Sequence, residues 1–161
     1  MVKSELLIRR GFPGEFVSMA ALAVRAWRIA ARDVELTAKR QEALEVKFLR
    51  DLQENVDGVL VAERGGIIAG WGARVPQSNY ISDLWVDPPH HGQRIGTQLL
   101  DALVAQILLN GFDEAVIGTH TDNLPAINLY KKAGFQIEWQ GEEWSESFSK
   151  TVGKVRMRTK L

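Results

Sequence analysis

The interpretation of this chain starts from one stretch near its middle: Leu84-Trp85-Val86-Asp87-Pro88-Pro89-His90-His91-Gly92-Gln93-Arg94-Ile95-Gly96-Thr97. This pattern predicts an apolar strand that two prolines end, then a tight turn, and then the beginning of a helix. Free backbone N–H groups and the dipole of a helix N-terminus attract anions, and Gly92 and Gly96 let a ligand approach the backbone closely. The stretch therefore indicates a site for an anion, with pyrophosphate as the expected one. An ordinary strand-to-helix turn is the alternative, since short glycine patterns are weak signals.

A second stretch predicts a helix with clear ends: Asn123-Leu124-Pro125-Ala126-Ile127-Asn128-Leu129-Tyr130-Lys131-Lys132-Ala133-Gly134-Phe135. Asp122 or Asn123 can cap the helix, Pro125 suits the first turn, and Gly134 ends the helix. Asn123 and Tyr130 are two helical turns apart and share a face, and the small Ala126 between them leaves room for a ligand. The alternative is an amphipathic helix whose tyrosine only packs against the core.

The spacing of apolar and turn-forming residues predicts the remaining elements. Strands are expected over Lys3–Arg9, Val59–Ala62, Ile67–Val75, Tyr80–Val86, Ala115–Thr119, Phe135–Trp139 and Lys154–Lys160. Helices are expected over Phe16–Arg32, Thr37–Leu52, Gln93–Asn110 and Asn123–Ala133. The order β-αα-βββ-α-β-α-ββ describes a mixed α/β domain of α+β type, and we expect residues 1–161 to form one domain.

Composition excludes several classes of function. The chain has 20 Lys and Arg against 20 Asp and Glu, so it lacks the basic field of a dedicated nucleic-acid-binding protein. It has no cysteine, which excludes disulfides, thiolate nucleophiles and cysteine-ligated metals. The neighbours His90 and His91 project in different directions, and no spaced carboxylate set accompanies them or His120, so we expect no metal site. The most apolar segment, Ile95–Leu109, is too short and polar to span a membrane, and no signal peptide is apparent, so a cytoplasmic protein is expected.

The two central stretches together resemble the GNAT (Gcn5-related N-acetyltransferase) superfamily. Its first motif is a strand of type Leu-x-Val-x-Pro followed by Gln/Arg-x-x-Gly-x-Gly/Ala. Leu84–Pro88 matches the strand, and His91–Gly96 occupies the loop. The second motif, Asn-x-x-Ala-x-x-Leu-Tyr-x-x-x-Gly-Phe, is matched in full by Asn123–Phe135. The resemblance covers about Tyr80 to Trp139 and implies a central, mixed but mostly antiparallel sheet of about seven strands flanked by four helices.

The resemblance departs from the family pattern at two positions of the loop. His91 stands where Gln or Arg is usual, and Arg94 stands where the first glycine of the motif is usual. The Arg94 backbone can still be helical, with its side chain turned outward. The loss of glycine flexibility would weaken pyrophosphate binding, whereas a charged contact from Arg94 to a phosphate would strengthen it.

The resemblance also implies acetyl-CoA as co-substrate and assigns roles to residues. The Leu84, Trp85 and Val86 backbone would bind the pantetheine arm as an added strand, and the Val86 N–H would polarise the thioester carbonyl and hold the oxyanion. Asn123 and Tyr130 would line the cofactor, and Tyr130 would stabilise the departing thiolate. The backbone N–H groups expected to hold the pyrophosphate belong to His91, Gly92, Gln93, Arg94, Ile95, Gly96 and Thr97.

An amine acceptor must lose a proton, so a general base or a water chain is expected. Asp83 is the first candidate, because it lies on the strand beside the acetyl site and shares a face with Trp85. His120 is the second, because its pKa range is suitable. The alternatives are that Asp83 faces solvent and that His120 bonds locally. The segment Trp139–Glu146 carries Glu142, Glu143 and Glu146 and would favour a cationic acceptor as an acidic rim, although packing of its indoles on a surface loop is the simpler interpretation.

Two functions from different classes follow. The leading one is an acetyl-CoA-dependent N-acetyltransferase, in which a primary amine attacks directly and forms a tetrahedral intermediate. Its acceptor is a small molecule or the amine of a peptide or protein, and homodimerisation is a family habit. The other is an acyl-CoA-binding or regulatory module without transfer, which the two loop departures and the missing acid on Val116–His120 keep open.

Overall fold

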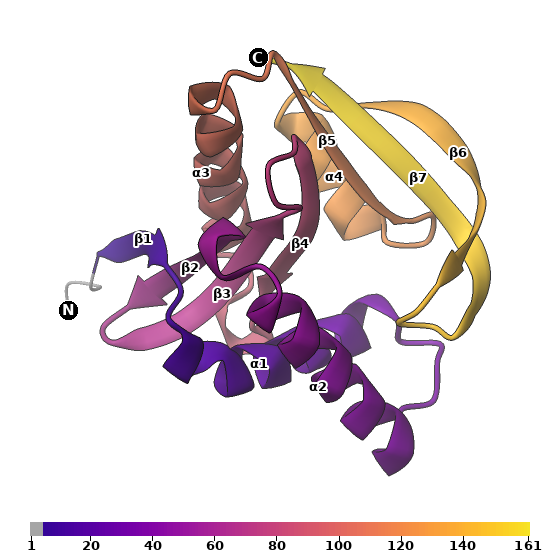
Figure 1. The fold of residues 1–161 in the computed structure, drawn as a ribbon. Coiled ribbons are helices and arrows are strands. Elements are labelled where there is room, and N and C mark those ends of the chain that lie inside the picture. The colour runs from indigo at the N-terminus through magenta and orange to yellow at the C-terminus, as the bar shows by residue number, and fades with distance from the viewer. Residues whose placement is uncertain (1–4) are drawn as a thin grey trace.

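The computed structural model describes residues 5–161 and contains one sheet of mixed direction (Figure 1). The strands follow the order β1-β2-β3-β4-β5-β7-β6, and all neighbours are antiparallel except the parallel pair β4–β5. The strands are β1 (Leu6–Arg10), β2 (Val59–Arg64), β3 (Ile67–Arg74), β4 (Tyr80–Val86), β5 (Glu114–His120), β6 (Gln136–Ser145) and β7 (Lys150–Lys160). The α-helices are α1 (Phe16–Ala30), α2 (Ala38–Gln53), α3 (Ile95–Leu109) and α4 (Leu124–Lys132).

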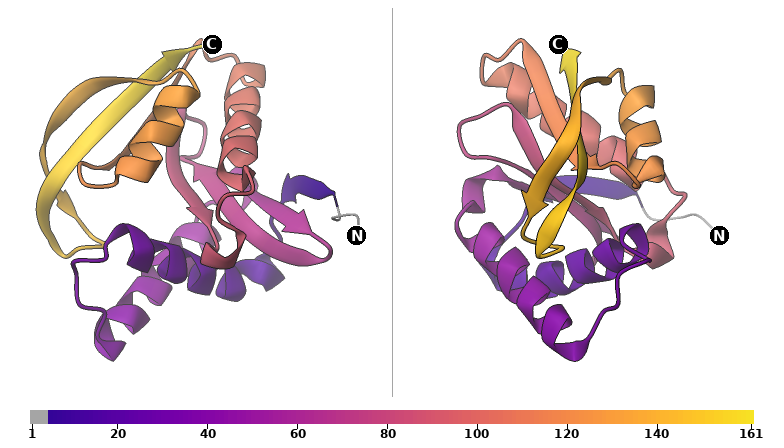
Figure 2. Two further views of the ribbon diagram at one scale, coloured as in Figure 1. Left: turned by 180° about the vertical axis from the view of Figure 1, so that it is seen from behind. Right: turned by 90° about the vertical axis from the view of Figure 1, so that its right-hand side faces the viewer.

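Helices cover both faces of the sheet, as the two views of Figure 2 show. Helices α1 and α2 bury one apolar cluster against β2 and β3, in which Trp71, Phe16 and Phe48 are the largest fully buried side chains. The Trp71 indole N–H donates to the Met19 carbonyl at 2.8 Å, which fixes α1 on the sheet. Helices α3 and α4 bury a second cluster on the other face, around Leu99, Leu103 and other residues. The four-residue steps of the apolar residues in α2 and α3 explain why each helix presents one buried face.

A bulge in β4 changes which face its side chains occupy. Ala73 is paired with Asp83, but the next residue, Arg74, is paired with Ile81, so Ser82 is the extra residue. Such a bulge bends the strand and shifts the alternation of side chains. Ile81 therefore joins the cluster under α3 and α4, whereas Trp85 packs against the cluster of α1 and α2.

The parallel pair β4–β5 is short. Its register contains two positions, Tyr80↔Val116 and Ile81↔Ile117, after which the strands part (Figure 1). We call this junction the seam. The second half of β4 therefore has a free edge in the middle of the sheet, where backbone groups can bind a ligand.

The predicted element order and sheet type are confirmed, and several boundaries differ. The β6–β7 hairpin is much longer than the expected strands Phe135–Trp139 and Lys154–Lys160. Helix α1 ends at Ala30 instead of Arg32, and α3 begins at Ile95 instead of Gln93. The expected start of the first strand, at Lys3, lies outside the described residues.

Candidate active site

A groove of about 470 Å³ runs along the free edge of β4. We call it the β4–α4 groove. Four segments line it: the end of α1, the second half of β4, the loop that leads into α3, and α4. Among its residues are Leu84, Trp85, Val86, His91, Gly92, Arg94, Ile95, Gly96, Thr97, Asn123 and Tyr130. All the residues that the sequence assigned to cofactor binding thus meet here except Gln93, whose side chain accepts a hydrogen bond from Arg64 at 2.6 Å.

The free edge of β4 presents the Val86 backbone to the groove. The Asp87 N–H donates to the Ala69 carbonyl of β3 at 2.8 Å, and backbone groups alternate between the two edges of a strand. The Val86 N–H and carbonyl therefore face the side that β5 has left. The His91 ring nitrogen Nε2 donates to the Val86 carbonyl at 2.9 Å. His91, which departs from the family motif, thus anchors the loop to β4.

The loop before α3 keeps the geometry of a glycine-rich anion site. Gly92 has φ of 76° and Arg94, the N-cap of α3, has φ of 64°. The expectation of a helical Arg94 backbone is wrong, because the residue adopts the left-handed conformation that glycine normally supplies. Its side chain is exposed, as expected, and has no hydrogen bond or ion pair among residues 5–161. Gly96 packs closely, since a Cβ there would lie 3.3 Å from Leu129.

Helix α4 carries Asn123 and Tyr130 on the face that lines the groove. Asn123 caps the helix through the Ala126 N–H at 3.4 Å and donates to the Thr119 hydroxyl at 3.1 Å. Tyr130 is 5% exposed, and its hydroxyl has no hydrogen-bond partner within the described chain. Burial raises the pKa of Tyr130 above its ordinary value of 10, so the phenol keeps its proton and can donate a hydrogen bond.

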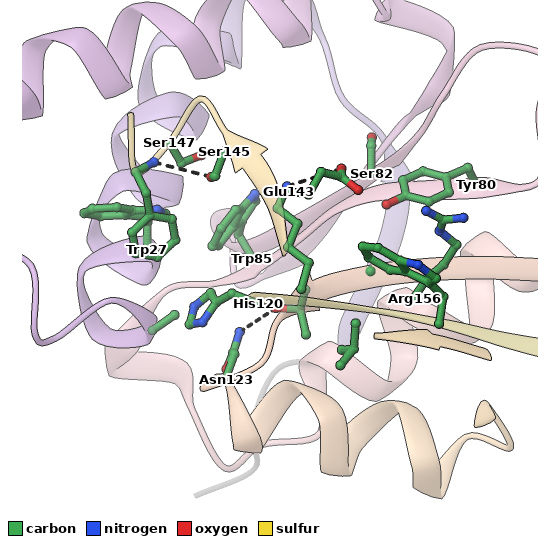
Figure 3. Close-up of a pocket in the computed structure, with 17 residues that line it drawn as sticks. Trp27, Tyr80, Ser82, Trp85, His120, Asn123, Glu143, Ser145, Ser147 and Arg156 are labelled. Carbon is green, nitrogen blue, oxygen red and sulfur yellow. Dashed lines mark hydrogen bonds and ion pairs between the residues drawn. The ribbon is translucent and has the colours of Figure 1, made fainter. Parts of the chain in front are cut away.

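A second cavity, of about 200 Å³, adjoins the groove on the other side of Trp85 (Figure 3). We call it the aromatic cavity, because Trp27, Tyr80, Trp85, Trp139 and Phe148 contribute to its lining. Ala30, Trp85 and Asn123 line both the groove and the cavity. The two spaces thus meet beyond the two paired positions of the seam, where β4 and β5 have parted.

His120 lies in the aromatic cavity and Asp83 does not. In Figure 3 His120 lies between Trp27 and Asn123, and its ring meets Phe148 edge-on with centroids 5.1 Å apart. The pKa of His120 is lowered, chiefly by burial, so its imidazole is neutral at pH 7. A neutral imidazole beside the groove can accept a proton.

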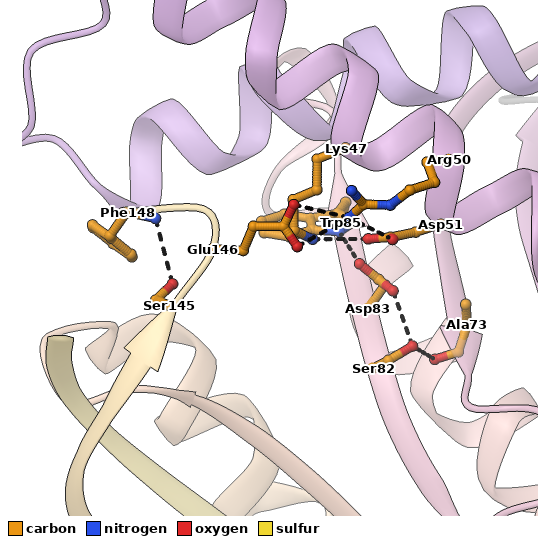
Figure 4. A network of polar contacts seen from close by, with 10 residues as sticks. All are labelled: Lys47, Arg50, Asp51, Ala73, Ser82, Asp83, Trp85, Ser145, Glu146 and Phe148. Carbon is orange, nitrogen blue, oxygen red and sulfur yellow. Dashed lines mark hydrogen bonds and ion pairs between the residues drawn. The ribbon is translucent and has the colours of Figure 1, made fainter. Parts of the chain in front are cut away.

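Asp83 supports Trp85 on the face of the sheet that α2 covers (Figure 4). Its carboxylate accepts the Trp85 indole N–H at 3.1 Å and the Ser82 hydroxyl at 2.9 Å. It lines neither the groove nor the aromatic cavity. Burial raises the pKa of Asp83, and the hydrogen bonds from Trp85 and Ser82 only partly offset it. The structure thus separates the first candidate base from the site and assigns it to the orientation of Trp85.

Sequence reasoning missed the contribution of residues far from the motifs. The end of α1 supplies Ala26, Ile29 and Ala30 to the groove, and Trp27 to the cavity. Nothing in the local pattern of a helix says which distant strand it will cover. Phe148 enters the cavity from the β6–β7 loop, where a single aromatic residue in a polar loop was the one available signal.

Neither a metal cluster nor a membrane-spanning helix is found among the described residues. Within residues 5–161, no three His, Asp or Glu side chains lie close enough together to hold a metal ion. None of the helices in the same residues combines the length and the apolar character that a membrane span requires.

Comparison with known proteins identifies the family. The model of the acetyltransferase (GNAT) family matches residues 18–135, which is most of the chain. The chain belongs to the GNAT family. Among curated proteins, this GNAT chain is 30% identical over 89 residues to mouse thialysine N-ε-acetyltransferase. That alignment covers 50% of the chain and 52% of the relative, so the match spans about half the length of each.

Solved structures share the whole GNAT fold at low identity. A GCN5-related N-acetyltransferase from Rhodopseudomonas palustris is 22% identical with a TM-score of 0.80, and the match covers 100% of this chain and 99% of that one. PaiA N-acetyltransferase from Thermoplasma acidophilum, solved with coenzyme A, is 17% identical with a TM-score of 0.74 over 98% and 99%. YncA from Salmonella typhimurium, solved with its cofactor acetyl-CoA, is 20% identical with a TM-score of 0.72 over 98% and 95%.

Proposed function

We propose that this GNAT protein is an acetyl-CoA-dependent N-acetyltransferase that transfers an acetyl group to a primary amine. The observation that carries the proposal is the meeting of two spaces: a groove suited to a phosphate-bearing thioester and a separate aromatic cavity, joined beside Trp85 and Asn123. The name of the mouse relative supports an amine acceptor, and relatives of the same fold were solved with CoA or acetyl-CoA. Residues 1–161 form one acetyltransferase domain in this proposal.

The groove has a backbone group for each part of the co-substrate. The loop from His91 to Thr97 leads into the N-terminus of a 15-residue helix, so its N–H groups and the helix dipole hold the pyrophosphate. The free edge at Leu84–Val86 binds the amides of the pantetheine arm as an added strand. The thioester then lies below the seam, between Val86 and Tyr130.

The transfer itself is a direct attack by the amine on the thioester carbonyl carbon. The C–N bond forms as the carbonyl π electrons move to oxygen, and the Val86 N–H holds the resulting oxyanion. When the tetrahedral intermediate collapses, the C–S bond breaks and the electron pair stays on sulfur. The nitrogen loses its remaining extra proton to solvent as the neutral amide forms. The Tyr130 hydroxyl donates a hydrogen bond to that thiolate and keeps its own proton, because its raised pKa opposes full proton transfer.

His120 is the proposed general base. It accepts a proton from the acceptor ammonium, either directly or through one water, and its lowered pKa keeps it neutral at pH 7. Asp83 is a positioning residue that fixes the indole of Trp85 at the junction of groove and cavity.

The test measures release of CoA from acetyl-CoA in the presence of a panel of primary amines. Because the chain has no cysteine, a thiol reagent reports CoA alone. Tyr130→Phe should retain acetyl-CoA affinity and thermal stability, since the hydroxyl has no partner to lose, while turnover falls by about 10–100-fold. Normal turnover in Tyr130→Phe would contradict the role of the hydroxyl. Normal CoA binding with no release across the panel would favour an acyl-CoA-binding module instead.

A further inference from the structure

The aromatic cavity contains three charged side chains, and one of them has no counter-ion. Glu143 and Lys154 form an ion pair with a distance of 3.8 Å. Arg156 also lines the cavity but has no carboxylate within ion-pair distance among residues 5–161. The nearby Glu138 is bound by Arg158 through Nε at 2.6 Å and Nη2 at 3.2 Å. The cavity therefore has an uncompensated positive charge.

This charge contradicts the acidic rim that the sequence suggested. Glu146 turns away from the cavity and accepts two hydrogen bonds from Arg50 of α2, both at 2.9 Å (Figure 4). Glu143 is balanced by Lys154. The net charge of the lining is positive, so the cavity favours an acceptor with a negative group.

The Arg156 guanidinium is held in place by its surroundings. Its Cζ lies 5.1 Å from the centroid of the Trp139 ring, which is a cation–π contact. Figure 3 shows Arg156 at one end of the cavity and Trp27 at the other. A stacked guanidinium keeps its N–H donors free in a fixed plane, which suits a carboxylate.

A second, independent feature is an unsatisfied polar atom of Trp27, whose side chain lines the cavity. The Trp27 indole nitrogen is buried and has no hydrogen-bond partner within residues 5–161, although Trp27 is only 3% exposed. Buried polar groups without a partner are rare in folded proteins. A ligand oxygen in the cavity would accept this hydrogen bond.

We propose that the aromatic cavity binds a small amine that carries a carboxylate, with the carboxylate on Arg156 and the amine directed toward Trp85 and Asn123. The proposal rests on the acetyltransferase function proposed above and specifies its acceptor. A volume of about 200 Å³ indicates a small molecule, since pockets for drug-sized ligands measure about 300–1,000 Å³. The indole walls contact the carbon chain between the two polar ends.

Binding tests this assignment without turnover. The protein is saturated with CoA, which cannot transfer an acetyl group, and titrated calorimetrically with matched pairs: β-alanine and β-alaninamide, γ-aminobutyrate and its amide, and phenylalanine and phenylalaninamide. At least one carboxylate should bind about 10–100-fold more tightly than its carboxamide, as expected for a charge-assisted hydrogen bond. The proposal is overturned if the carboxylate and the carboxamide of every pair bind equally tightly. It is also overturned if none of the compounds binds.

Substitutions that remove either a positive or a negative charge from the lining identify the residue that binds the carboxylate. Arg156→Gln should remove the preference for the carboxylate, and Arg156→Lys should restore part of it. Glu143→Gln should strengthen the preference, because it removes the negative charge from the lining. Arg28→Gln, which removes an exposed guanidinium outside the lining, should leave the preference unchanged. An unchanged preference in Arg156→Gln, in a variant that still binds CoA, overturns the assignment.

The same proteins separate this inference from the proposed function. Release of CoA with amines that carry no carboxylate, together with equal binding of carboxylate and carboxamide, would support the acetyltransferase function and reject the carboxylate site. Preferential carboxylate binding without release of CoA from acetyl-CoA would support the carboxylate site and reject the transferase function.

Discussion

At the scale of single residues, Arg94 combines a strained backbone with an unpartnered charge. A non-glycine residue in the left-handed region costs about 1–2 kcal/mol, and the Arg94 guanidinium lies at the mouth of the anion loop without a partner among the described residues. We therefore propose that the Arg94 side chain acts on the ligand of this loop.

Arg94→Gly should therefore change stability and affinity in opposite directions. The free energy of unfolding without ligand should rise by up to about 1 kcal/mol, because the strain is relieved, while acetyl-CoA affinity should fall by about tenfold with the loss of a charged contact. Urea denaturation and calorimetry measure the two effects. Arg94→Ala is the matched control, since it removes the charge and keeps the strain. Unchanged affinity in both variants would show that the side chain faces solvent.

Asp83 gives a second prediction, which concerns pH. Because burial raises its pKa in the folded state above the ordinary value of 3.8, the folded protein binds this proton more tightly than the unfolded chain does. The stability that this proton contributes is fully present below pH 3.8, and it is lost as the pH rises through the raised folded-state pKa of Asp83. Asp83→Asn, whose Oδ1 can accept the Trp85 N–H and whose amide can donate to the Ser82 hydroxyl, should match the wild type near pH 4 and be more stable at pH 7 in urea denaturation. A variant that is less stable at pH 7 would contradict this.

At the scale of elements, the β6–β7 loop is fastened to α2. Arg50 binds the Glu146 carboxylate with two hydrogen bonds, and Arg40 donates to the carbonyls of Ser147 and Phe148, each at 3.3 Å. This fastening holds the Phe148 ring 5.3 Å from that of Trp27, inside the aromatic cavity. The loop thereby forms one wall of the proposed acceptor site.

Loosening this loop should affect the acceptor more than the fold. An exposed ion pair contributes about 0–1 kcal/mol, so Arg50→Gln should change the free energy of unfolding little. The KM for the acceptor should rise, while the KM for acetyl-CoA, whose groove the loop does not line, stays the same. The double exchange Arg50→Glu with Glu146→Arg serves as the control and should restore the acceptor KM. An unaffected acceptor KM in Arg50→Gln would separate the loop from the site.

The accuracy of sequence prediction varied among elements for physical reasons. Strand β4 was predicted with its observed bounds, because tyrosine and two prolines mark its limits. The β6–β7 hairpin was underestimated, because Gly141, Gly153 and a run of exposed glutamates resemble a loop. Its exposed faces lack the apolar alternation that marks a half-buried strand. The motif residues of the site were predicted by resemblance, whereas Trp27, Phe148 and the position of Asp83 depend on packing and on the bulge at Ser82.

At the scale of the whole molecule, the groove collects residues from segments far apart in the chain. The end of α1, β4, the loop before α3, and α4 all line it. A ligand that contacts all four links the two halves of the sheet on either side of the seam. Such a ligand binds the folded state and not the unfolded chain, so it must raise the unfolding temperature.

Acetyl-CoA should therefore produce a large thermal shift. At a concentration of about one hundred times Kd it adds about 2.7 kcal/mol, which for a domain of this size corresponds to roughly 5–10 °C. Differential scanning fluorimetry measures the shift, with CoA as the positive comparison and ATP as the control for phosphates alone. No shift at millimolar acetyl-CoA would contradict the assignment of the groove.

The seam has a mechanical consequence. Two residue pairs, Tyr80↔Val116 and Ile81↔Ile117, form the pairing register between the two half-sheets, so we expect the sheet to bend more easily along this line than elsewhere. Bending about that line would widen or narrow the gap between the parted ends of β4 and β5. The empty protein should flex there on a microsecond-to-millisecond timescale, which broadens the amide resonances of β4 and β5 next to the gap. A ligand bound between β4 and β5 would restrict this bending motion. Release of the product would then be limited by the rate at which the gap reopens.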